Sequence, residues 1–227
     1  MLEVSNVKLP LDAGLPEGGA LVRAAAAAAL GVAEGDVRTV RTVKRSVDAR
    51  KKRDVHFVAT LGVELVDEAA EERALAVAIV RGGAGAIVGT HVKRHEPYEP
   101  LDVPLRAAAA ANAGEPRPIV VGAGPAGLFC ALYLARAGLR PLVLERGGDV
   151  DERLAAVDAF AAGGDLDPQT NIQFGEGGAG TFSDGKLTTN IKNPMARHVL
   201  RWFVDAGAPE EILWQAKPHI GTDLLVD

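Results

Sequence analysis

The sequence predicts an α/β protein in two parts, a small α+β domain followed by an incomplete βαβ unit. Prolines crowd the stretch between Glu96 and Pro118 and divide the chain there. Upstream, the expected elements follow in the order strand, helix, strand, strand, helix, strand. Downstream, an apolar strand leads into a G-x-G-x-x-G turn that begins at Gly122.

The composition and net charge of the chain limit the classes of protein to which it can belong. The 227 residues are 48% hydrophobic, which is enough for two small cores. The 25 basic and 30 acidic residues give a formal charge of −5, so no general attraction to nucleic acid is expected. The single cysteine, Cys130, excludes an internal disulfide and is expected to pack on the helix after the glycine turn. Met1–Ser5 has no basic or apolar leader pattern, so a cytoplasmic location is expected.

The first domain is expected to be a ferredoxin-like α+β sandwich, because its order of elements is typical of that fold. Alternating apolar residues predict a half-buried strand over Val55–Leu65, and alanine content predicts a helix over Gly18–Leu30. His56, His91 and His95 lack metal-site spacing and are expected at solvent-facing strand positions. The other predicted elements are strands over Leu2–Leu9, Val37–Val47 and Ile87–Val92, and a helix over Glu68–Val80.

The turn between the two middle strands is strongly basic. Lys44, Arg45 and the run Arg50–Arg53 lie there together with Asp48 and Asp54. Contact with an anion or a nucleic acid is one interpretation. A charged, solvated hairpin end is the favoured one, because no aromatic residues interleave to stack on bases.

Four prolines over residues 97–117, followed directly by Pro118, indicate a linker there, since no single helix or central strand accommodates them. Arg106–Asn112 is alanine-rich and predicts a short helix inside it. The predicted domains are therefore 1–96 and 118–227.

The strand Pro118–Val121, the glycine turn and a helix over Leu128–Gly138 form the first half of a βαβ unit. Gly122 allows the sharp turn, Gly124 leaves room for a pyrophosphate, and Gly127 allows close packing of helix and strand. The second strand, from Pro141, ends in Glu145, whose carboxylate can accept hydrogen bonds from the ribose hydroxyls of a dinucleotide. This Rossmann-like pattern predicts a dinucleotide site, and the carboxylate disfavours the 2′-phosphate of NADP.

Two simpler interpretations compete with the dinucleotide site. The glycines could form an ordinary flexible loop, or the uncharged stretch between Arg117 and Arg136 could be a membrane span. The complete order of strand, turn, helix, strand and acid argues against both.

A second glycine cluster follows a helix predicted over Val150–Ala162. The segment Phe174–Leu187 exposes many backbone N–H groups that can surround a phosphate or a ribityl chain. It lacks the G-K-[ST] ending of an ATP-binding loop. An ordinary surface loop is the alternative, but a simple NAD-binding unit has no need of this segment.

These residues resemble the uncharacterised bacterial FAD-dependent dehydrogenases, also called NAD(FAD)-utilising dehydrogenases. The resemblance rests on Gly122–Gly127 with Glu145, on Gln173–Leu187, and on the basic segment Arg45–Lys51. It implies a flavoprotein with the glutathione-reductase type of FAD fold and FAD as its cofactor.

By position, the resemblance assigns roles around the FAD. Gly122, Gly124, Pro125, Ala126 and Gly127 would bind the pyrophosphate, Glu145 the adenosine ribose, and Arg146 and Arg153 the adenine or a phosphate. Gly178, Gly180 and Thr181 would lie near the pyrophosphate and ribityl chain, with Ser183, Asp184 and Lys186 near the flavin.

Proteins of this kind continue well beyond the position of Asp227, so the chain is expected to be an N-terminal fragment that is inactive by itself. Its expected function is the FAD-binding portion of an oxidoreductase whose substrate and catalytic residues are unknown. An NAD-binding dehydrogenase fragment, or a nucleotide-binding or RNA-associated protein with structural FAD, are the alternatives. The expected partners are an unidentified small-molecule substrate and, as an open option, NAD(P)H. No membrane partner is expected, and the oligomeric state stays open.

Overall fold

A computed structural model describes residues 1–96, 116–182, 185–189, 191, 193 and 195–226. The chain separates into two compact units: Met1–Glu99 with Ile191–Pro218, and Pro100–Asn190 with His219–Asp227. Each unit is described by itself. Most of the predicted linker, and the helix expected over Arg106–Asn112, lie outside the described residues.

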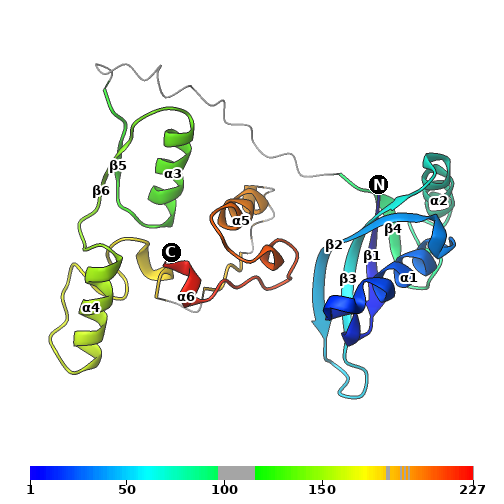
Figure 1. Ribbon diagram of the computed structural model, residues 1–227, viewed down its shortest axis with the longest axis horizontal. Coiled ribbons are helices and arrows are strands. Elements are labelled where there is room, and N and C mark those ends of the chain that lie inside the picture. The colour runs from blue at the N-terminus through cyan, green and yellow to red at the C-terminus, as the bar shows by residue number, and fades with distance from the viewer. Residues whose placement is uncertain (97–115, 183–184, 190, 192, 194, 227) are drawn as a thin grey trace. The chain divides into compact units, whose positions relative to one another are not determined.

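The first unit contains a four-stranded antiparallel sheet with the strand order β2-β3-β1-β4 (Figure 1). Its principal elements are β1 (Leu2–Leu9), α1 (Gly19–Leu30), β2 (Val37–Asp48), β3 (His56–Leu65), α2 (Glu68–Val80) and β4 (His91–Arg94). Short 3-10 turns cover η1 (Leu11–Gly14), η2 (Pro16–Gly18) and η3 (Glu34–Asp36). The predicted order of strands and helices is confirmed.

Local sequence explains where the two helices begin and end. Helix α1 ends at Gly31, whose φ of 73° lies in the left-handed region that glycine adopts without strain. Helix α2 begins after Asp67, whose carboxylate accepts a hydrogen bond from the N–H of Ala69 at 2.9 Å.

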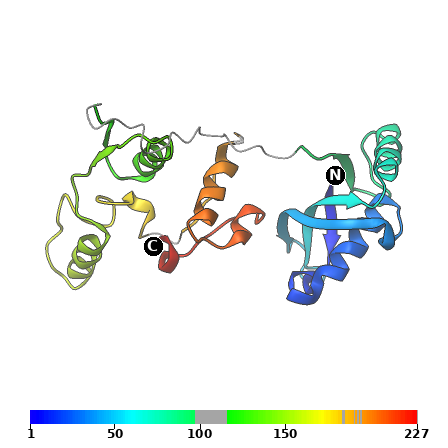
Figure 2. The same ribbon diagram turned by 45° about the horizontal axis from the view of Figure 1, so that its top comes forward.

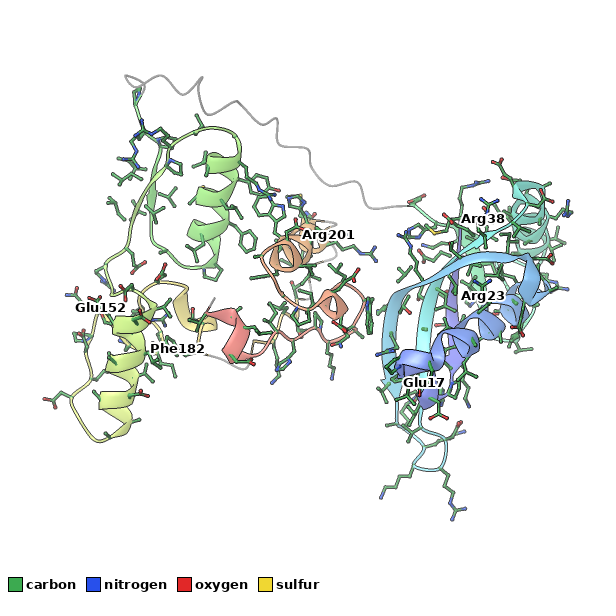
Figure 3. The ribbon with its side chains drawn as sticks, viewed as in Figure 1. Glu17, Arg23, Arg38, Glu152, Phe182 and Arg201 are labelled. Atoms are coloured by element: carbon green, nitrogen blue, oxygen red, sulfur yellow. The ribbon has the colours of Figure 1, made fainter. Side chains whose placement is uncertain are left out.

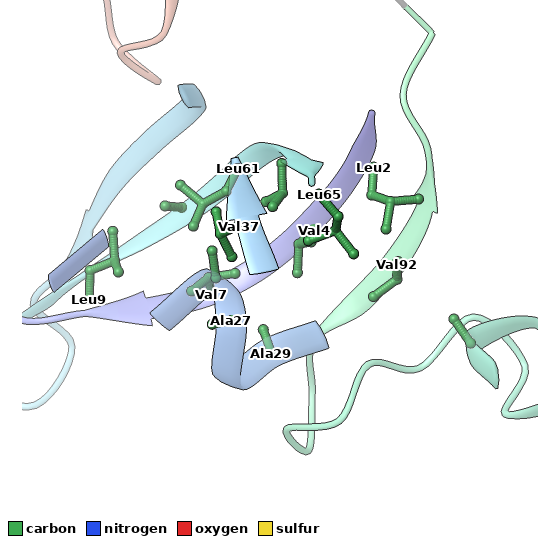
Figure 4. Packing of buried hydrophobic residues seen from close by; sticks show 14 of the residues in the cluster. Leu2, Val4, Val7, Leu9, Ala27, Ala29, Val37, Leu61, Leu65 and Val92 are labelled. Atoms are coloured by element: carbon green, nitrogen blue, oxygen red, sulfur yellow. The ribbon is translucent and has the colours of Figure 1, made fainter. Parts of the chain in front are cut away.

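The core of this unit lies between the sheet and the helices. Alternate side chains of β1 and β3 pack with small residues of α1 and α2, so both helices cover one face of the sheet (Figure 4). The buried residues include Leu2, Val4, Val7, Leu9, Ala26, Ala27, Ala29, Leu61, Val63, Leu65, Ala78 and Val92. Alanines on α1 allow the helix to lie close along the strands, as Figures 1 and 2 show.

Two sequence-based expectations for this unit are wrong. The last strand begins at His91 rather than Ile87, and Ile87 lies in a loop with 46% of its surface exposed. His95 is buried rather than solvent-facing. Its ring contacts Glu3 Oε2 through Nδ1 at 3.2 Å and Arg41 Nη2 through Nε2 at 3.0 Å, and these polar partners make burial possible.

A later segment of the chain belongs to the same unit. It contains α5 (Met195–Asp205) and η6 (Glu210–Leu213) and then pairs with β2. Arg45 N–H donates to Trp214 O at 2.8 Å, and Ala216 N–H donates to Arg45 O at 2.9 Å. The Arg45 guanidinium lies 4.5 Å from the Phe57 ring centroid and 4.4 Å from that of Trp214. Part of the basic turn is therefore involved in aromatic packing, which the spacing along the sequence did not indicate.

The second unit contains two parallel strands, β5 (Ile119–Val121) and β6 (Leu142–Leu144), joined through α3 (Pro125–Arg136). Figure 2 shows α3 beside these strands. After them come α4 (Val150–Ala161), η5 (Gly178–Gly180) and α6 (Thr222–Leu225). Helix α3 begins three residues before the predicted Leu128, because Pro125 has the fixed φ that suits the first helical position.

The apolar faces of this unit are largely exposed. Helix α3 has no buried residue, and Val121 and Ile119 are 82% and 63% exposed. Cys130 is also exposed, so the expectation that it packs inside is wrong for the described structure. Among the described residues, no helix combines the length and apolar character needed to cross a membrane.

Candidate dinucleotide site

The three glycines of the first turn differ in whether the structure requires glycine at their positions, and why. Gly122 joins β5 to the turn with a φ of 97°. At Gly127 a side chain would collide with the carbonyl oxygen of Gly122, so glycine is needed for the close approach of helix and turn. Gly124 has an ordinary extended backbone, φ −74° and ψ 179°, and a Cβ there would meet no atom within 4 Å.

Gly124 therefore has neither a conformational nor a packing reason to be glycine. It is the N-cap of α3, a position that serine, asparagine or aspartate normally fills well. Ala126 and Gly127 follow Pro125 in the first turn of the helix, where backbone N–H groups have no carbonyl partner within the helix. Open space beside Gly124 and this helix terminus together suit an approaching phosphate.

Glu145 follows β6 directly and is bonded to the glycine turn. Its Oε2 accepts the N–H of Ala123 at 2.7 Å, and its Oε1 accepts the N–H groups of Arg146 and Gly147, each at 2.9 Å. A carboxylate has about four acceptor positions, so roughly one stays open for a ligand hydroxyl. The backbone donors of Ala123 and Gly147 hold the pKa of this carboxyl below its ordinary value of 4.5.

The second glycine segment contacts the first glycine turn. Gly177 N–H donates to Ala123 O at 2.8 Å. At Gly178, whose φ is 66°, a Cβ would lie 3.2 Å from Pro125 Cδ and 3.5 Å from Gly124 Cα. The two segments, about fifty residues apart in the sequence, thus form one continuous surface around Gly124.

The remaining predicted site residues differ in their surroundings. A Cβ on Gly180 would meet nothing within 4 Å, whereas Thr181 is buried. Lys186 is exposed and forms a β-bridge with His219. Ser183 and Asp184 lie outside the described residues.

The two arginines after β6 have different surroundings. Arg146 is exposed, and its guanidinium lies 5.6 Å from the Phe174 ring centroid. A depression next to it is lined by Arg146, Asp165, Leu166, Asp167, Pro168, Gln169 and Thr170. Arg153, in contrast, has no exposed surface, and its guanidinium donates to backbone carbonyls of the second loop. Its predicted contact with adenine or phosphate stays a prediction.

Two features at the start of α4 were not predicted from the sequence. Asp149 caps α4 by accepting the N–H of Glu152 at 2.9 Å, and the D-x-x-E spacing could have indicated this cap. Gly147 is also close to the loop, because a Cβ there would lie 2.6 Å from Gly175 Cα. No local pattern indicates that approach, since the two glycines are separated by the whole helix.

Comparison with known proteins agrees with this geometry. Residues 120–151 match the family described as NAD(P)-binding Rossmann-like domain, and residues 1–64 match a domain of unknown function, DUF8436. An uncharacterised protein of Clostridium beijerinckii is 38% identical over 224 residues. That alignment covers 99% of this chain and 38% of the relative, so the chain spans less than half of the relative's length.

The second unit therefore contains a βαβ structure, β5-α3-β6, that is similar to a Rossmann-like dinucleotide-binding domain. The first unit is a mixed α/β domain with an antiparallel sheet, similar over residues 1–64 to a domain whose function is unknown.

Proposed function

We propose that this chain contains the FAD-binding portion of a flavin-dependent oxidoreductase whose substrate is unidentified. The contact of the second glycine segment with the first glycine turn carries the choice of FAD. Gly124 supports a bound dinucleotide, because glycine stands there although neither backbone conformation nor packing requires it. The contact between Gly177 and Ala123 supports an extended cofactor, because it brings a second glycine-rich segment, with open space at Gly180, beside the first glycine turn. This arrangement also supports the resemblance to the FAD-dependent dehydrogenases.

In this proposal each segment binds one part of the cofactor. Gly122–Gly127 and the start of α3 hold the pyrophosphate, and the open acceptor position of Glu145 takes one ribose hydroxyl. The depression next to Arg146 has space for the adenine. The pyrophosphate and ribityl chain lie along Gly178, Gly180 and Thr181. The flavin lies near Lys186 and near Ser183 and Asp184, which precede it in the sequence.

Bound FAD would supply the hydride- or electron-accepting group of the oxidoreductase. The chain's own contribution would be binding, orientation and charge. A cation such as Lys186 near the flavin would stabilise its reduced, anionic form. NAD(P)H and a small molecule are the proposed redox partners of the whole protein.

The domain assignment is part of the proposal. We propose a ferredoxin-like domain over residues 1–96, a linker over 97–117 and the dinucleotide-binding domain over 118–227. Within the last range, Ile191–Pro218 belongs to the first compact unit. The strand order β2-β3-β1-β4 with both helices on one face supports the ferredoxin-like assignment. We also propose that the protein is cytoplasmic.

NAD is the second candidate cofactor, because the family model matched by residues 120–151 is described as NAD(P)-binding. It shares the adenosine diphosphate half with FAD, so Gly124 and Glu145 do not discriminate between the two. The second glycine loop does, since an NAD-only site needs no contact there.

Titration of the purified 227-residue chain with FAD, NAD⁺ and ADP tests the proposal. We expect FAD to bind more tightly than ADP, with a change in the visible flavin spectrum. A Gly180→Val variant should weaken FAD binding about tenfold or more, because the side chain would occupy the open space beside the loop, and should leave ADP affinity within about twofold. Arg140→Met, an exposed change in the same unit, is the control. Equal affinities for FAD and ADP, unaffected by the valine, would contradict the FAD assignment and favour NAD.

A further inference from the structure

Arg153 is the largest fully buried side chain among the described residues. Its guanidinium is surrounded by carbonyl oxygens of residues 171–176, where the second glycine loop begins. Nε donates to Asn171 O at 3.2 Å, and Nη2 donates to Asn171 O and Ile172 O, both at 3.1 Å. Nη1 donates to Glu176 O. Four of the five N–H donors of an arginine are thus directed at the loop backbone.

The loop is shaped around this side chain. Gly175 has a φ of 114°, and a Cβ there would collide with the aliphatic stem of Arg153. The ring of Phe182, labelled in Figure 3, lies with its centroid 4.6 Å from the guanidinium carbon. Arg153 therefore fills the interior of the loop between Asn171 and Phe182.

Further bonds connect the loop to the start of α4. Glu176 Oε2 accepts the N–H of Val150 at 3.1 Å, and Glu176 N–H donates to Gly148 O at 3.1 Å. The next residue, Gly177, is the one whose N–H reaches Ala123 O. The hydrogen bond from Arg153 to Glu176 O thus lies one residue before the contact between the two glycine segments.

We propose that Arg153 is a positioning residue that holds the second glycine loop against the first glycine turn, and that it is not a direct ligand of a phosphate. The cofactor part of this inference rests on the proposed function, and the loop part does not. The fork of the guanidinium matches several carbonyls at once, which a lysine ammonium on a flexible chain does not reproduce.

Hydrogen exchange of the 227-residue chain without cofactor tests the loop part. In Arg153→Met and Arg153→Lys variants we expect amides of Gly175–Gly178 to exchange about tenfold faster or more, because buried carbonyls lose their donors. Amides of β5 should keep their wild-type rates, and Arg140→Met should change neither set. Unchanged loop exchange, or faster exchange throughout β5 and α3, would overturn the proposal.

Titration with FAD and with ADP tests the part that concerns the cofactor. A positioning role predicts that Arg153→Lys binds FAD as poorly as Arg153→Met does, about tenfold or more below the wild type, with ADP affinity less affected. A phosphate ligand would be rescued in part by the lysine charge, and that rescue would overturn the proposal. If the wild-type chain binds no FAD, the proposed function fails, whereas the exchange experiment still decides the loop role.

Discussion

Gly124 and Gly127 differ in why they are glycine, although the motif presents them as equivalents. A substitution at Gly127 meets the carbonyl of Gly122, whereas a substitution at Gly124 points into open space. The fold does not require glycine at position 124, so a bound ligand explains why glycine is there. Stability and binding should therefore respond in opposite ways at these two positions.

We expect Gly124→Asp to leave the thermal midpoint unchanged or slightly higher, because aspartate is a good N-cap and complements the helix dipole. The same change should reduce affinity for ADP or FAD about a hundredfold, because a carboxylate would occupy and repel the pyrophosphate position. Thermal unfolding and isothermal titration measure the two effects. Gly127→Ala is the matched comparison and should destabilise the second unit. A strongly destabilised Gly124→Asp protein would disprove the assignment of Gly124 to a ligand.

Glu145 links folding of the second unit to pH. Its folded-state pKa lies below the ordinary 4.5 because backbone N–H groups of Ala123 and Gly147 stabilise the carboxylate. A depressed carboxyl pKa contributes stability above the unfolded value, and that stability is lost as the pH falls through the folded value.

The expected result is a loss of stability of the second unit below about pH 4.5 that is smaller in Glu145→Gln. Chemical shifts of the Glu145 carboxyl carbon and the Ala123 amide should titrate together, with a midpoint below 4.5. Gln169→Glu, which adds a carboxyl group in the same unit, controls for general charge effects. A midpoint at or above the ordinary value would contradict the bonding described for Glu145.

At the scale of elements, sequence patterns located helices and strands well and misplaced some of their ends. Strand β1 and helix α2 have the predicted bounds, because alternation and capping are local signals. Strand β4 was predicted too early because Ile87 and Val88 are apolar but pair with no strand. Helix α3 begins before the predicted Leu128 because Pro125 is the first residue of the helix and not part of the turn.

The N-cap of α2 gives a quantitative test at this scale. Asp67→Ala should lower the free energy of unfolding of the first unit by about 1 kcal/mol, since the Ala69 N–H loses its acceptor. Asp67→Asn should restore most of the difference. Urea unfolding followed by circular dichroism measures both. Equal stability of Asp67→Ala and the wild type would show that the cap contributes nothing.

At the scale of the whole molecule, the basic hairpin and the dinucleotide site belong to different units. Within the hairpin, Arg50 donates to Asp48, and Asp54 accepts from Lys8 of the neighbouring strand β1 at 2.7 Å. Lys51 and Lys52 are exposed at the tip. Ion pairing within the hairpin favours a solvated turn over a nucleic-acid contact.

We expect Lys51→Glu, Lys52→Glu to leave dinucleotide affinity within about twofold of the wild type. Neither protein should retain single-stranded RNA at physiological salt in a filter-binding assay. Wild-type binding that falls steeply with salt and disappears in the variant would instead support the RNA-associated alternative.

The sequence by itself determined the order of strands and helices from β1 to β4 and from β5 to α4, and the glycine turn followed by Glu145. These features depend on periodicity, capping and spacing over a few residues. Only the tertiary structure decided that Gly177 contacts Ala123, that His95 is buried between Glu3 and Arg41, and that Arg153 lies inside the second loop. Such contacts join residues many positions apart, and chain folding, which no local pattern encodes, brings them together.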